Sequence, residues 1–281
     1  MALRRGVAAC AAVVAMATGA TRVVADQPVD WQIGFQEPAT PIMESISEFN
    51  DLLVPIIVII TAVVLALLAY IVVRFNARSN PTPSRTTHNT VLEFAWTVVP
   101  IIILVVIAVP SIRLLYYSDR VPEADMTIKA TGHQWYWSYE YPDNGGFTFD
   151  AVIKDEADLA PDELRLLTTD NHVVLPVATT IRVQIMADDV LHAWAVPAFG
   201  VKKDAVPGRL TEVWVRVERE GTYYGQCSEL CGERHGYMPI QVEVVSKAAF
   251  DEWVVEAQAQ FAATAPGPAM ASAATAEPAR F

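Results

Sequence analysis

Near its C-terminal end the chain carries the stretch Gly225-Gln226-Cys227-Ser228-Glu229-Leu230-Cys231-Gly232-Glu233-Arg234-His235-Gly236-Tyr237-Met238. Its cysteines, histidine and methionine follow the spacing Cys-x3-Cys-x3-His-x2-Met. Sulfur and imidazole ligands together favour copper over hard cations. The spacing is too short for a zinc finger, in which a long loop separates the two ligand pairs. A further ligand is needed, and His192 is the best candidate, so the sequence predicts a copper site.

The two thiolates in this stretch indicate more than one metal ion. A methionine, a histidine and one cysteine on a β-barrel are typical of a mononuclear blue-copper site. Here Cys227 and Cys231 are close enough in sequence for both sulfurs to bridge two ions, with His192, His235, Met238 and a carbonyl oxygen completing a dinuclear centre. Two alternatives remain open at this point: a closed Cys2His2 zinc site, and a structural disulfide between Cys227 and Cys231.

The first part of the chain has the pattern of an exported membrane protein. The chain is 53% hydrophobic with a mean hydropathy of +0.28. Residues 1–25 are typical of a signal peptide, and they contain the third cysteine, Cys10. The apolar runs Leu52–Val73 and Phe94–Ile112 are long enough to cross a bilayer, and they predict helices at about 48–74 and 94–116.

The loop between these helices sets the expected orientation. It contains Arg74, Arg78 and Arg85 against the single acid Glu93. By the positive-inside rule this loop is cytoplasmic. We therefore expect a multi-pass protein of the plasma (inner) membrane whose C-terminal domain lies on the periplasmic, outer side.

After Tyr117 the composition changes to short β-rich runs separated by turn signals such as Pro142-Asp143-Asn144-Gly145-Gly146. This punctuation predicts an all-β sandwich or Greek-key barrel, closed by one helix at Lys247–Phe261 with Ser246 as its N-cap. The expected division is an N-terminal segment and hairpin at 26–117, a β domain at 118–258 and a disordered Ala/Pro-rich tail at 259–281. The expected strands are Met126–Tyr141, His172–Met186, His192–Pro197, Thr211–Val217, Thr222–Gly225 and Tyr237–Val245.

The net charge of −12 is concentrated in the β domain, where residues 118–258 contain 24 Asp and Glu against 12 Lys and Arg. A solvated acidic surface is the ordinary interpretation. The alternative is a docking face for a basic partner, because complementary fields raise the rate of encounter.

Taken together, these motifs resemble subunit II of a haem–copper cytochrome c oxidase of the bacterial aa3 type. The resemblance covers most of the mature chain, and it implies a cupredoxin-like Greek-key barrel after the two-helix transmembrane hairpin. It also implies a dinuclear copper centre, CuA, bound by His192, Cys227, the Glu229 backbone carbonyl, Cys231, His235 and Met238. The matching stretches are Leu92-Glu93-Phe94-Ala95-Trp96-Thr97-Val98-Val99-Pro100, Gly132-His133-Gln134-Trp135-Tyr136-Trp137-Ser138-Tyr139-Glu140, Asp189-Val190-Leu191-His192-Ala193-Trp194, Asp204-Ala205-Val206-Pro207-Gly208-Arg209 and Tyr223-Tyr224-Gly225-Gln226-Cys227-Ser228-Glu229-Leu230-Cys231-Gly232.

The resemblance further implies roles for single residues. Trp135 is implied to be the residue through which electrons enter from cytochrome c. The alternative is ordinary core packing, because at the period of a strand one face would carry His133, Trp135, Trp137, Tyr139 and Tyr141. The Glu229 side chain binds a Mg2+ shared with subunit I. Glu93 lies at the mouth of a proton path in subunit I, or is simply a favourable charge at a helix N-terminus. The carboxylates implied to meet cytochrome c, each otherwise a solvated surface acid, are Glu140, Asp150, Asp170 and Asp189.

The function implied is to accept electrons from reduced cytochrome c and pass them to the haem of subunit I, where O2 is reduced with proton translocation. The implied partners are subunits I and III, cytochrome c and the lipid bilayer, with no nucleic acid. One alternative is a membrane-anchored copper delivery or assembly protein, which would need exposed, exchangeable ligands. Another is the CuA domain of a nitrous oxide reductase, which carries many more histidines than the 5 found here.

Overall fold

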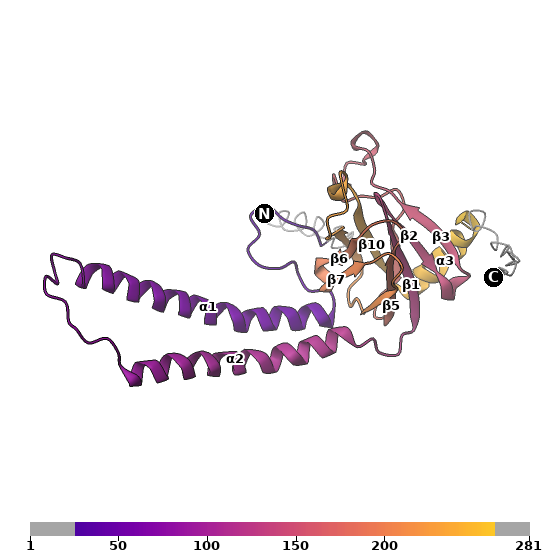
Figure 1. Ribbon diagram of the computed structural model, residues 1–281. Helices are drawn as coiled ribbons and strands as arrows, with labels where there is room; N and C mark the ends of the chain where they lie inside the picture. Colours follow the sequence, from indigo (N-terminus) through magenta and orange to yellow (C-terminus); the bar gives the residue numbers. More distant parts are fainter. Residues whose placement is uncertain (1–25, 262–281) are drawn as a thin grey trace, which may run out of the picture.

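The computed structural model describes residues 26–261, which form two long helices and a β domain (Figure 1). Helices α1 (Pro41–Arg74) and α2 (Thr90–Asp119) run side by side and are both long and apolar enough to cross a membrane. The β domain sits at the end of the hairpin opposite its connecting loop, and helix α3 (Lys247–Phe261) closes the domain on its far side. The signal peptide expected at 1–25 lies outside the described residues.

Helix α1 begins at Pro41, earlier than the expected start near 48, because its first turn has a complete cap. The Thr40 side chain accepts a hydrogen bond from Met43 N at 3.1 Å, and Pro41 occupies the first helical position, where no N–H is needed. The prediction rested on the apolar run at 52–73, which covers only the part of α1 long and apolar enough to cross a membrane. The part of α1 before this run forms the junction with the β domain.

Helix α2 is also longer than the expected 94–116. Its N-cap is Asn89, whose side chain accepts from Val91 N and Leu92 N, and the Glu93 carboxylate accepts in return from Asn89 N at 3.3 Å. These bonds satisfy backbone donors that a helix start leaves free. Glu93 therefore has a capping role whatever else it does.

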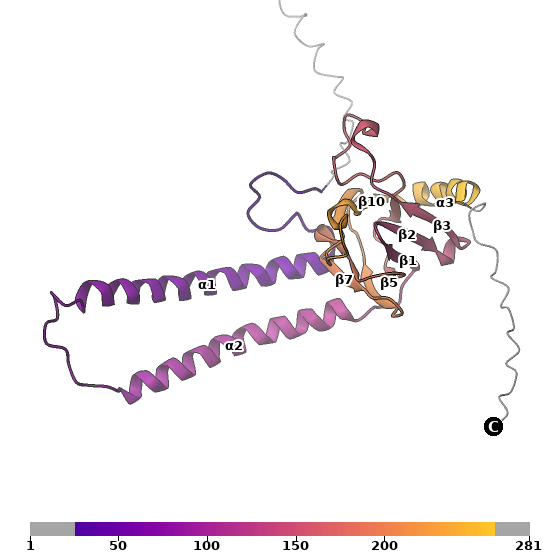
Figure 2. The same cartoon turned by 45° about the horizontal axis from the view of Figure 1, so that its top comes forward.

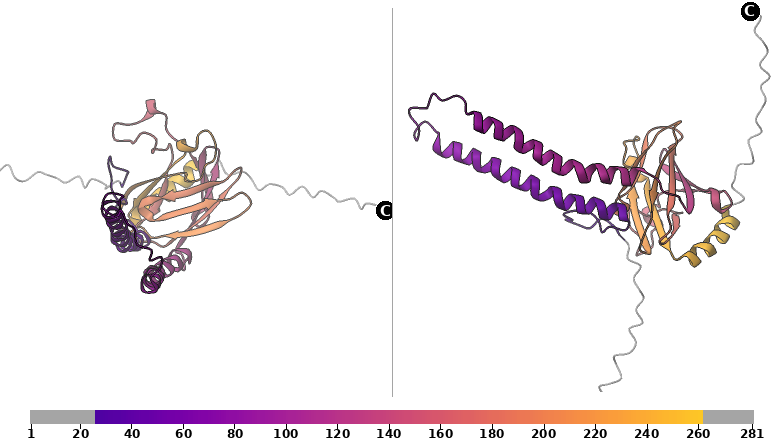
Figure 3. Two further views of the ribbon diagram at one scale, coloured as in Figure 1. Left: turned by 60° about the vertical axis from the view of Figure 1, so that its left-hand side comes forward. Right: turned by 90° about the horizontal axis from the view of Figure 1, so that it is seen from below.

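The β domain consists of three small sheets. The largest is five-stranded in the order β3-β2-β1-β5-β8, with β1 and β5 parallel; the second is β4-β10-β9 and the third is β6-β7. The views in Figures 1 and 3 show the sheets facing one another around a common interior. The strands are β1 (Met126–His133), β2 (Tyr136–Tyr141), β3 (Phe147–Ala151), β4 (Val173–Pro176), β5 (Ile181–Ala187), β6 (His192–Val196), β7 (Val201–Ala205), β8 (Thr211–Val215), β9 (Gly221–Gln226) and β10 (Pro239–Val245).

Some expected strand limits were wrong. The run Met126–Tyr141 is two strands, because the chain reverses at Gln134 and Trp135 and pairs β1 with β2 as an antiparallel hairpin. The run His172–Met186 is likewise two strands, which lie in different sheets. Strands β3 and β7 were not predicted. Strand β3 is short and follows a Gly-Gly turn. Strand β7 carries the charged residues Lys202, Lys203 and Asp204, which obscure the residue pattern of a strand.

The hairpin at 134–135 also corrects the expected facing of the aromatic run. Trp137, Tyr139 and Tyr141 are buried on one face of β2, as the strand period predicts. His133 is not on that face: it pairs with Tyr136 across the hairpin, and their rings stack with centroids 4.6 Å apart. A two-residue reversal changes which positions share a face.

Helix α3 covers the outer aromatic part of the core. Trp253 packs edge-on against Phe147, with ring centroids 5.7 Å apart, and Phe250 is buried. Ser246 caps the helix as expected by accepting from Ala249 N. The helix continues to Phe261, whose ring stacks on Phe149 at 5.0 Å. Residues 259–261, expected to belong to a disordered tail, are therefore helical, and the rest of the expected tail lies outside the described residues.

Both membrane helices are fastened to the β domain. Thr40 Oγ1 donates to the Phe199 carbonyl at 2.8 Å, and Met43 lies against Gly200, where a side chain would meet the helix backbone. On α2, the Trp214 indole donates to the Tyr117 carbonyl at 3.2 Å, and the two rings meet edge to face. The β domain is thus held in a fixed place over the hairpin.

Candidate metal centre

The ligand stretch is the loop that joins two antiparallel strands. Strands β9 and β10 pair from Gly221↔Val244 to Gln226↔Pro239, and residues 227–238 connect their ends. Cys227 N donates to the Met238 carbonyl at 3.3 Å, which closes the base of this loop. Cys227 and Met238, the first and last predicted ligands in this loop, are therefore neighbours, because the strand register brings them together.

Within this loop the predicted donor atoms converge. The Sγ atoms of Cys227 and Cys231 are 3.9 Å apart, and Cys231 Sγ lies 3.5 Å from Met238 Sδ and 3.5 Å from His235 Nδ1. The Glu229 carbonyl oxygen lies 3.4 Å from Cys227 Sγ. Both cysteines are buried and not bonded to each other, so the disulfide considered above is not formed.

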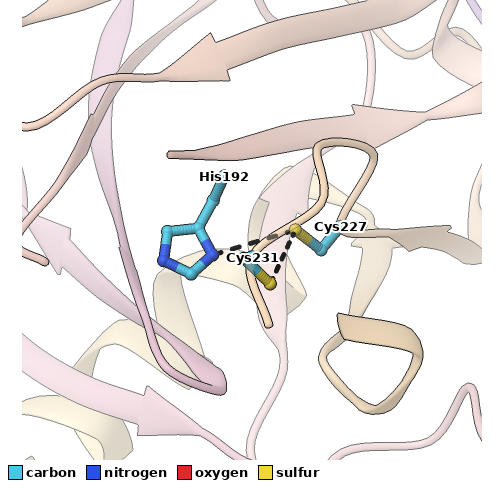
Figure 4. A group of neighbouring side chains, drawn as sticks. All are labelled: His192, Cys227 and Cys231. Carbon is cyan, nitrogen blue, oxygen red and sulfur yellow. Dashed lines mark hydrogen bonds between the residues drawn. The ribbon is translucent and has the colours of Figure 1, made fainter. Parts of the chain in front are cut away.

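The sixth donor residue comes from a different sheet. His192 opens β6, is fully buried and points Nδ1 at Cys227 Sγ, 3.8 Å away (Figure 4). His192 Nδ1 and the two sulfurs lie within 4.8 Å of one another. The bond from Ser228 N to the Ala193 carbonyl at 3.0 Å ties the ligand loop to β6 and fixes this approach.

Two glycines make the convergence possible. A Cβ on Gly132 of β1 would lie 2.9 Å from His192 Cδ2, and a Cβ on Gly225 of β9 would overlap the Ala195 carbonyl oxygen. The lack of side chains lets the histidine ring lie against β1 and lets β9 lie against β6. Sequence reasoning did not single out either glycine, because nothing near them in sequence indicates the close approach.

Asp189 orients His192. Its Oδ1 lies 2.9 Å from His192 Nε2, and its carboxylate also accepts from the backbone N–H groups of Gln134 at 2.7 Å and Val190 at 2.6 Å. Because Nε2 faces Asp189, Nδ1 faces the sulfurs, and a bound metal would take the place of any proton on Nδ1. Asp189 is the one predicted docking carboxylate that contacts a predicted metal ligand.

The charges of these groups are linked. Burial raises the pKa of Cys227, but hydrogen bonds from His192 and the Ala193 backbone outweigh it and leave the pKa at about 7. Burial and the neighbouring Cys227 raise the pKa of Cys231. For Asp189, burial is outweighed by hydrogen bonds from His192, Val190 and Gln134, so its pKa is lowered. Without a cation the site thus favours one thiolate, and a bound cation is what would stabilise two.

Trp135 lies over the same loop. Its indole N–H donates to the Cys231 carbonyl at 3.3 Å, and its ring lies beside Gly232, where a Cβ would be 3.1 Å from Trp135 Cζ2. Gln134, which sequence reasoning missed, donates to the same Cys231 carbonyl from its side chain at 2.8 Å. Its place directly before Trp135 was the available signal, but the contact joins residues 97 positions apart.

Three acids carry charge near Tyr136, the residue after Trp135. Burial raises the pKa of Tyr136, and the charges of Asp150, Asp188 and Asp189 raise it further. Asp188 was not predicted; it is exposed and lies 3.8 Å from His133 Nδ1.

The other predicted docking acids lie on or next to the same sheet. Glu140 on β2 is 3.4 Å from Lys129 Nζ, and Asp150 on β3 accepts from Ser138 Oγ at 2.6 Å. Asp170 lies in the loop before β4 and accepts from Val152 N at 2.7 Å.

The two remaining predicted residues, Glu93 and Glu229, lie away from the predicted docking acids. Glu93 is in the first turn of α2, at the end of the hairpin away from the β domain. Glu229 belongs to the ligand loop, where its carbonyl oxygen faces Cys227 while its side chain is partly exposed. Two cysteine sulfurs, two imidazoles and a thioether, all buried except the half-buried His235, are a soft donor set that fits copper.

The comparisons with known proteins point to one family. The family model "Cytochrome C oxidase subunit II, periplasmic domain" matches residues 126–245, and its transmembrane counterpart matches residues 28–114. A probable cytochrome c oxidase subunit 2 of Rickettsia bellii is 54% identical over 230 residues, covering 82% of this chain and 86% of the relative. Cytochrome c oxidase subunit 2 of Oenothera berteroana is 46% identical over 240 residues, covering 83% and 93%. The crystal structure of the periplasmic domain of subunit II (CoxB) of Bradyrhizobium japonicum is 55% identical, covers 50% of this chain and 99% of its own, and has a TM-score of 0.48.

Proposed function

The chain belongs to the cytochrome c oxidase subunit II family, through which electrons enter a haem–copper oxidase, and we propose that its copper site is a dinuclear CuA centre. The chain is a membrane-anchored subunit of an oxidoreductase complex, and its C-terminal domain is cupredoxin-like. The proposed ligands are His192, Cys227, the Glu229 carbonyl, Cys231, His235 and Met238.

The observation that carries the proposal is the pairing of donors around the two sulfurs. Cys227 Sγ has His192 Nδ1 and the Glu229 carbonyl beside it, whereas Cys231 Sγ has His235 Nδ1 and Met238 Sδ. One imidazole and one weaker donor thus accompany each sulfur, which suits two metal ions bridged by two thiolates. When bound, the copper pair supplies one-electron redox chemistry.

The protein's part in this chemistry is to hold the ligands still and to exclude water. Cys227, Cys231, Met238 and His192 are all at most 3% exposed. One backbone hydrogen bond, from Ser228 N to the Ala193 carbonyl, fixes the loop to β6, and another, from Cys227 N to the Met238 carbonyl, closes its base. A rigid, dry site keeps small the rearrangement that accompanies electron transfer.

Trp135 is the proposed point at which electrons arrive from reduced cytochrome c. It is half-buried, it packs on the ligand loop, and its N–H donates to the carbonyl of the ligand Cys231. An aromatic ring at the edge of the site also offers an apolar contact at the centre of an otherwise charged docking surface.

The surrounding carboxylates are the proposed docking surface for the basic face of cytochrome c. Glu140, Asp150, Asp170 and Asp189 lie on or beside the β1–β2–β3 part of the five-stranded sheet, and Asp189 accepts from the backbone N–H of Gln134, the residue before Trp135. Asp188 joins this set through its position beside Tyr136. Complementary charge steers the encounter, while most of the binding comes from close apolar contact.

Further roles depend on the rest of the complex. We place the Glu229 side chain at a Mg2+ ion shared with subunit I, since a lone partly exposed carboxylate needs ligands from a partner to hold that ion. We place Glu93 at the start of a proton path in subunit I. Electrons then pass to the haem of subunit I, subunit III completes the assembly, and proton translocation accompanies O2 reduction.

The same proposal places the β domain on the outer, periplasmic side of the plasma membrane. Arg74 is the last residue of α1, Arg78 follows α1, and Arg85 lies before α2, at the end of the hairpin opposite the domain. Positively charged ends of this kind face the cytoplasm.

Metal analysis and electron paramagnetic resonance of the purified full chain, reconstituted with copper, test the proposal. We expect two copper ions per chain and a hyperfine pattern from one electron shared by two equivalent coppers. A Cys231→Ser variant should lose this pattern. One copper per chain, or zinc in its place, would refute the dinuclear assignment and leave the family membership intact.

A further inference from the structure

The segment before α1 is a loop with both ends fixed to the β domain. Asp26 N donates to the Thr222 carbonyl at 3.0 Å, and Ala39 N donates to the Ala198 carbonyl at 2.9 Å. Near the second end, Arg219 forms an ion pair with Glu37 at 2.8 Å and also donates to the Pro38 carbonyl at 3.1 Å. Residues 27–36 therefore stand out from the domain as one closed loop.

Gln32 organises the outer part of this loop. Its side-chain oxygen accepts from Val29 N at 3.4 Å, and its side-chain nitrogen donates to the Phe35 carbonyl at 2.9 Å. Gln32 N also donates to the Val29 carbonyl at 3.2 Å. These bonds satisfy backbone groups at the tip from within the loop.

The side chains that the tip presents are apolar and uncovered. Trp31 is 97% exposed, Ile33 is 100% exposed, and Val29 and Phe35 are both more than half exposed. Single exposed apolar residues are common on protein surfaces, but four within seven positions on an organised loop indicate an interaction site.

The loop points toward the membrane-crossing part of the chain. In Figures 1 and 2, the indigo segment before α1 leaves the β domain and reaches back along the domain-proximal part of α1, on the side away from α2. The right-hand view in Figure 3 agrees. Helix α1 has 34 residues and is about 51 Å long, more than the roughly 30 Å of bilayer hydrocarbon. Its apolar run starts at Leu52, so the part beside the loop lies near the surface of the bilayer.

We propose that the tip Val29–Phe35 inserts into the interfacial region of the outer leaflet beside α1, as a second membrane contact of this subunit. Tryptophan and phenylalanine suit this region, where an apolar ring is buried and polar atoms stay wet. The loop is continuous with the membrane-anchoring hairpin. Residues 26–40 contain no lysine or arginine, so binding depends on apolar burial and needs no anionic lipid.

An environment-sensitive fluorophore on the loop tests the proposal in the intact oxidase. Ile33→Cys is labelled with a nitrobenzoxadiazole reagent, and the oxidase is placed in phosphatidylcholine nanodiscs. The native cysteines at the metal site are buried, and labelled wild-type oxidase gives the background. The matched control is Val255→Cys on α3, which is 67% exposed on the side of the domain away from the hairpin.

We expect emission from position 33 to be blue-shifted relative to position 255 and quenched by lipids that carry bromine near the headgroup, in low and high salt alike. A blue shift without quenching by brominated lipid would mean that the tip packs on another subunit, and it would overturn the proposal. Emission equal to that at position 255 would mean that the tip stays in water, with the same consequence. Neither failure would bear on the copper centre.

Discussion

The Nε2 atom of His192 lies 2.9 Å from Oδ1 of Asp189, while Nδ1 of the same ring faces the two cysteine sulfurs. The same carboxylate accepts from the backbone N–H of Gln134, the residue before Trp135. One side chain thus orients a proposed metal ligand and contacts the turn that carries the proposed electron-transfer tryptophan. Because these bonds run through Asp189, a change there should affect the copper site as well as the docking of cytochrome c.

Replacing Asp189 by Asn should therefore weaken copper binding. An amide at this position gives up the charged acceptor that orients the His192 ring, and loss of such a supporting group commonly lowers metal affinity roughly 10- to 100-fold. Competitive copper titration measures the change. Asp188→Asn removes the same charge from a neighbour that has no bond to His192, and its affinity should stay unchanged. Equal losses of copper affinity in both variants would show that the affinity depends on nearby negative charge and not on the orientation of the His192 ring.

Gly132→Ala should displace His192. The added Cβ would lie 2.9 Å from His192 Cδ2 in the centre of a sheet, where neither group can easily move. We expect copper affinity to fall by roughly 10-fold or more, with an altered absorption spectrum, because a ligand is pushed from its place.

Gly236→Ala is the matched control for this substitution, since Gly236 lies between two ligands but has no atom within 4 Å of an added Cβ. Its spectrum should stay normal. A normal spectrum in Gly132→Ala would mean that His192 is not a ligand or that β1 yields easily.

Trp135→Ala should slow turnover with reduced cytochrome c while leaving the copper spectrum in place. Truncating a central aromatic contact costs about 2 kcal/mol, roughly 30-fold, where it anchors an interface. Steady-state kinetics with cytochrome c, compared with a small diffusible reductant, separates docking from damage to the metal. Loss of the copper spectrum would assign Trp135 to the support of the ligand loop.

The encounter with cytochrome c should weaken as salt rises, because exposed charges are screened over about 10 Å at 0.1 M ionic strength. Asp150→Asn and Asp188→Asn should each lower the second-order rate at low salt by a few-fold at most and flatten its salt dependence. Stopped-flow reduction at several salt concentrations measures this. Glu256→Gln on α3 makes the same charge change elsewhere, and a slope reduced equally by it would argue against a local docking surface.

The His172–Glu243 pair, 2.8 Å apart, should make the β domain sensitive to acid. The hydrogen bond from His172 holds the pKa of Glu243 below its ordinary value of 4.5. A carboxylate with a lowered folded-state pKa stabilises the fold above its unfolded-state pKa, and this contribution is lost as pH falls through the folded-state pKa.

Glu243→Gln should accordingly lower the thermal unfolding midpoint at neutral pH, with the gap to the wild type closing as pH falls below about 4.5. Tryptophan fluorescence of the purified chain follows the transition. A gap that stays constant with pH would mean that the substitution acts through packing.

The convergence of most donor atoms in the candidate site was readable from the sequence because the predicted ligands are local. Cys227, Cys231, His235 and Met238 lie within one loop, and their spacing indicates the metal whatever the fold around them. The apolar runs of α1 and α2 were equally clear, since crossing a bilayer requires uninterrupted apolar length. Their ends were less clear, because capping by Thr40 and Asn89 depends on backbone geometry.

The sequence by itself determined the donor atoms, the membrane hairpin and the acidic character of the outer domain, because each depends on residue type over a short stretch. Only the tertiary structure decided that Asp189 orients His192, that Gly132 and Gly225 admit the ligands, and that Gln134 and Trp135 touch Cys231. These contacts join residues from different strands. Their positions follow from strand register and from the space that glycines leave, and no local pattern of residues predicts either.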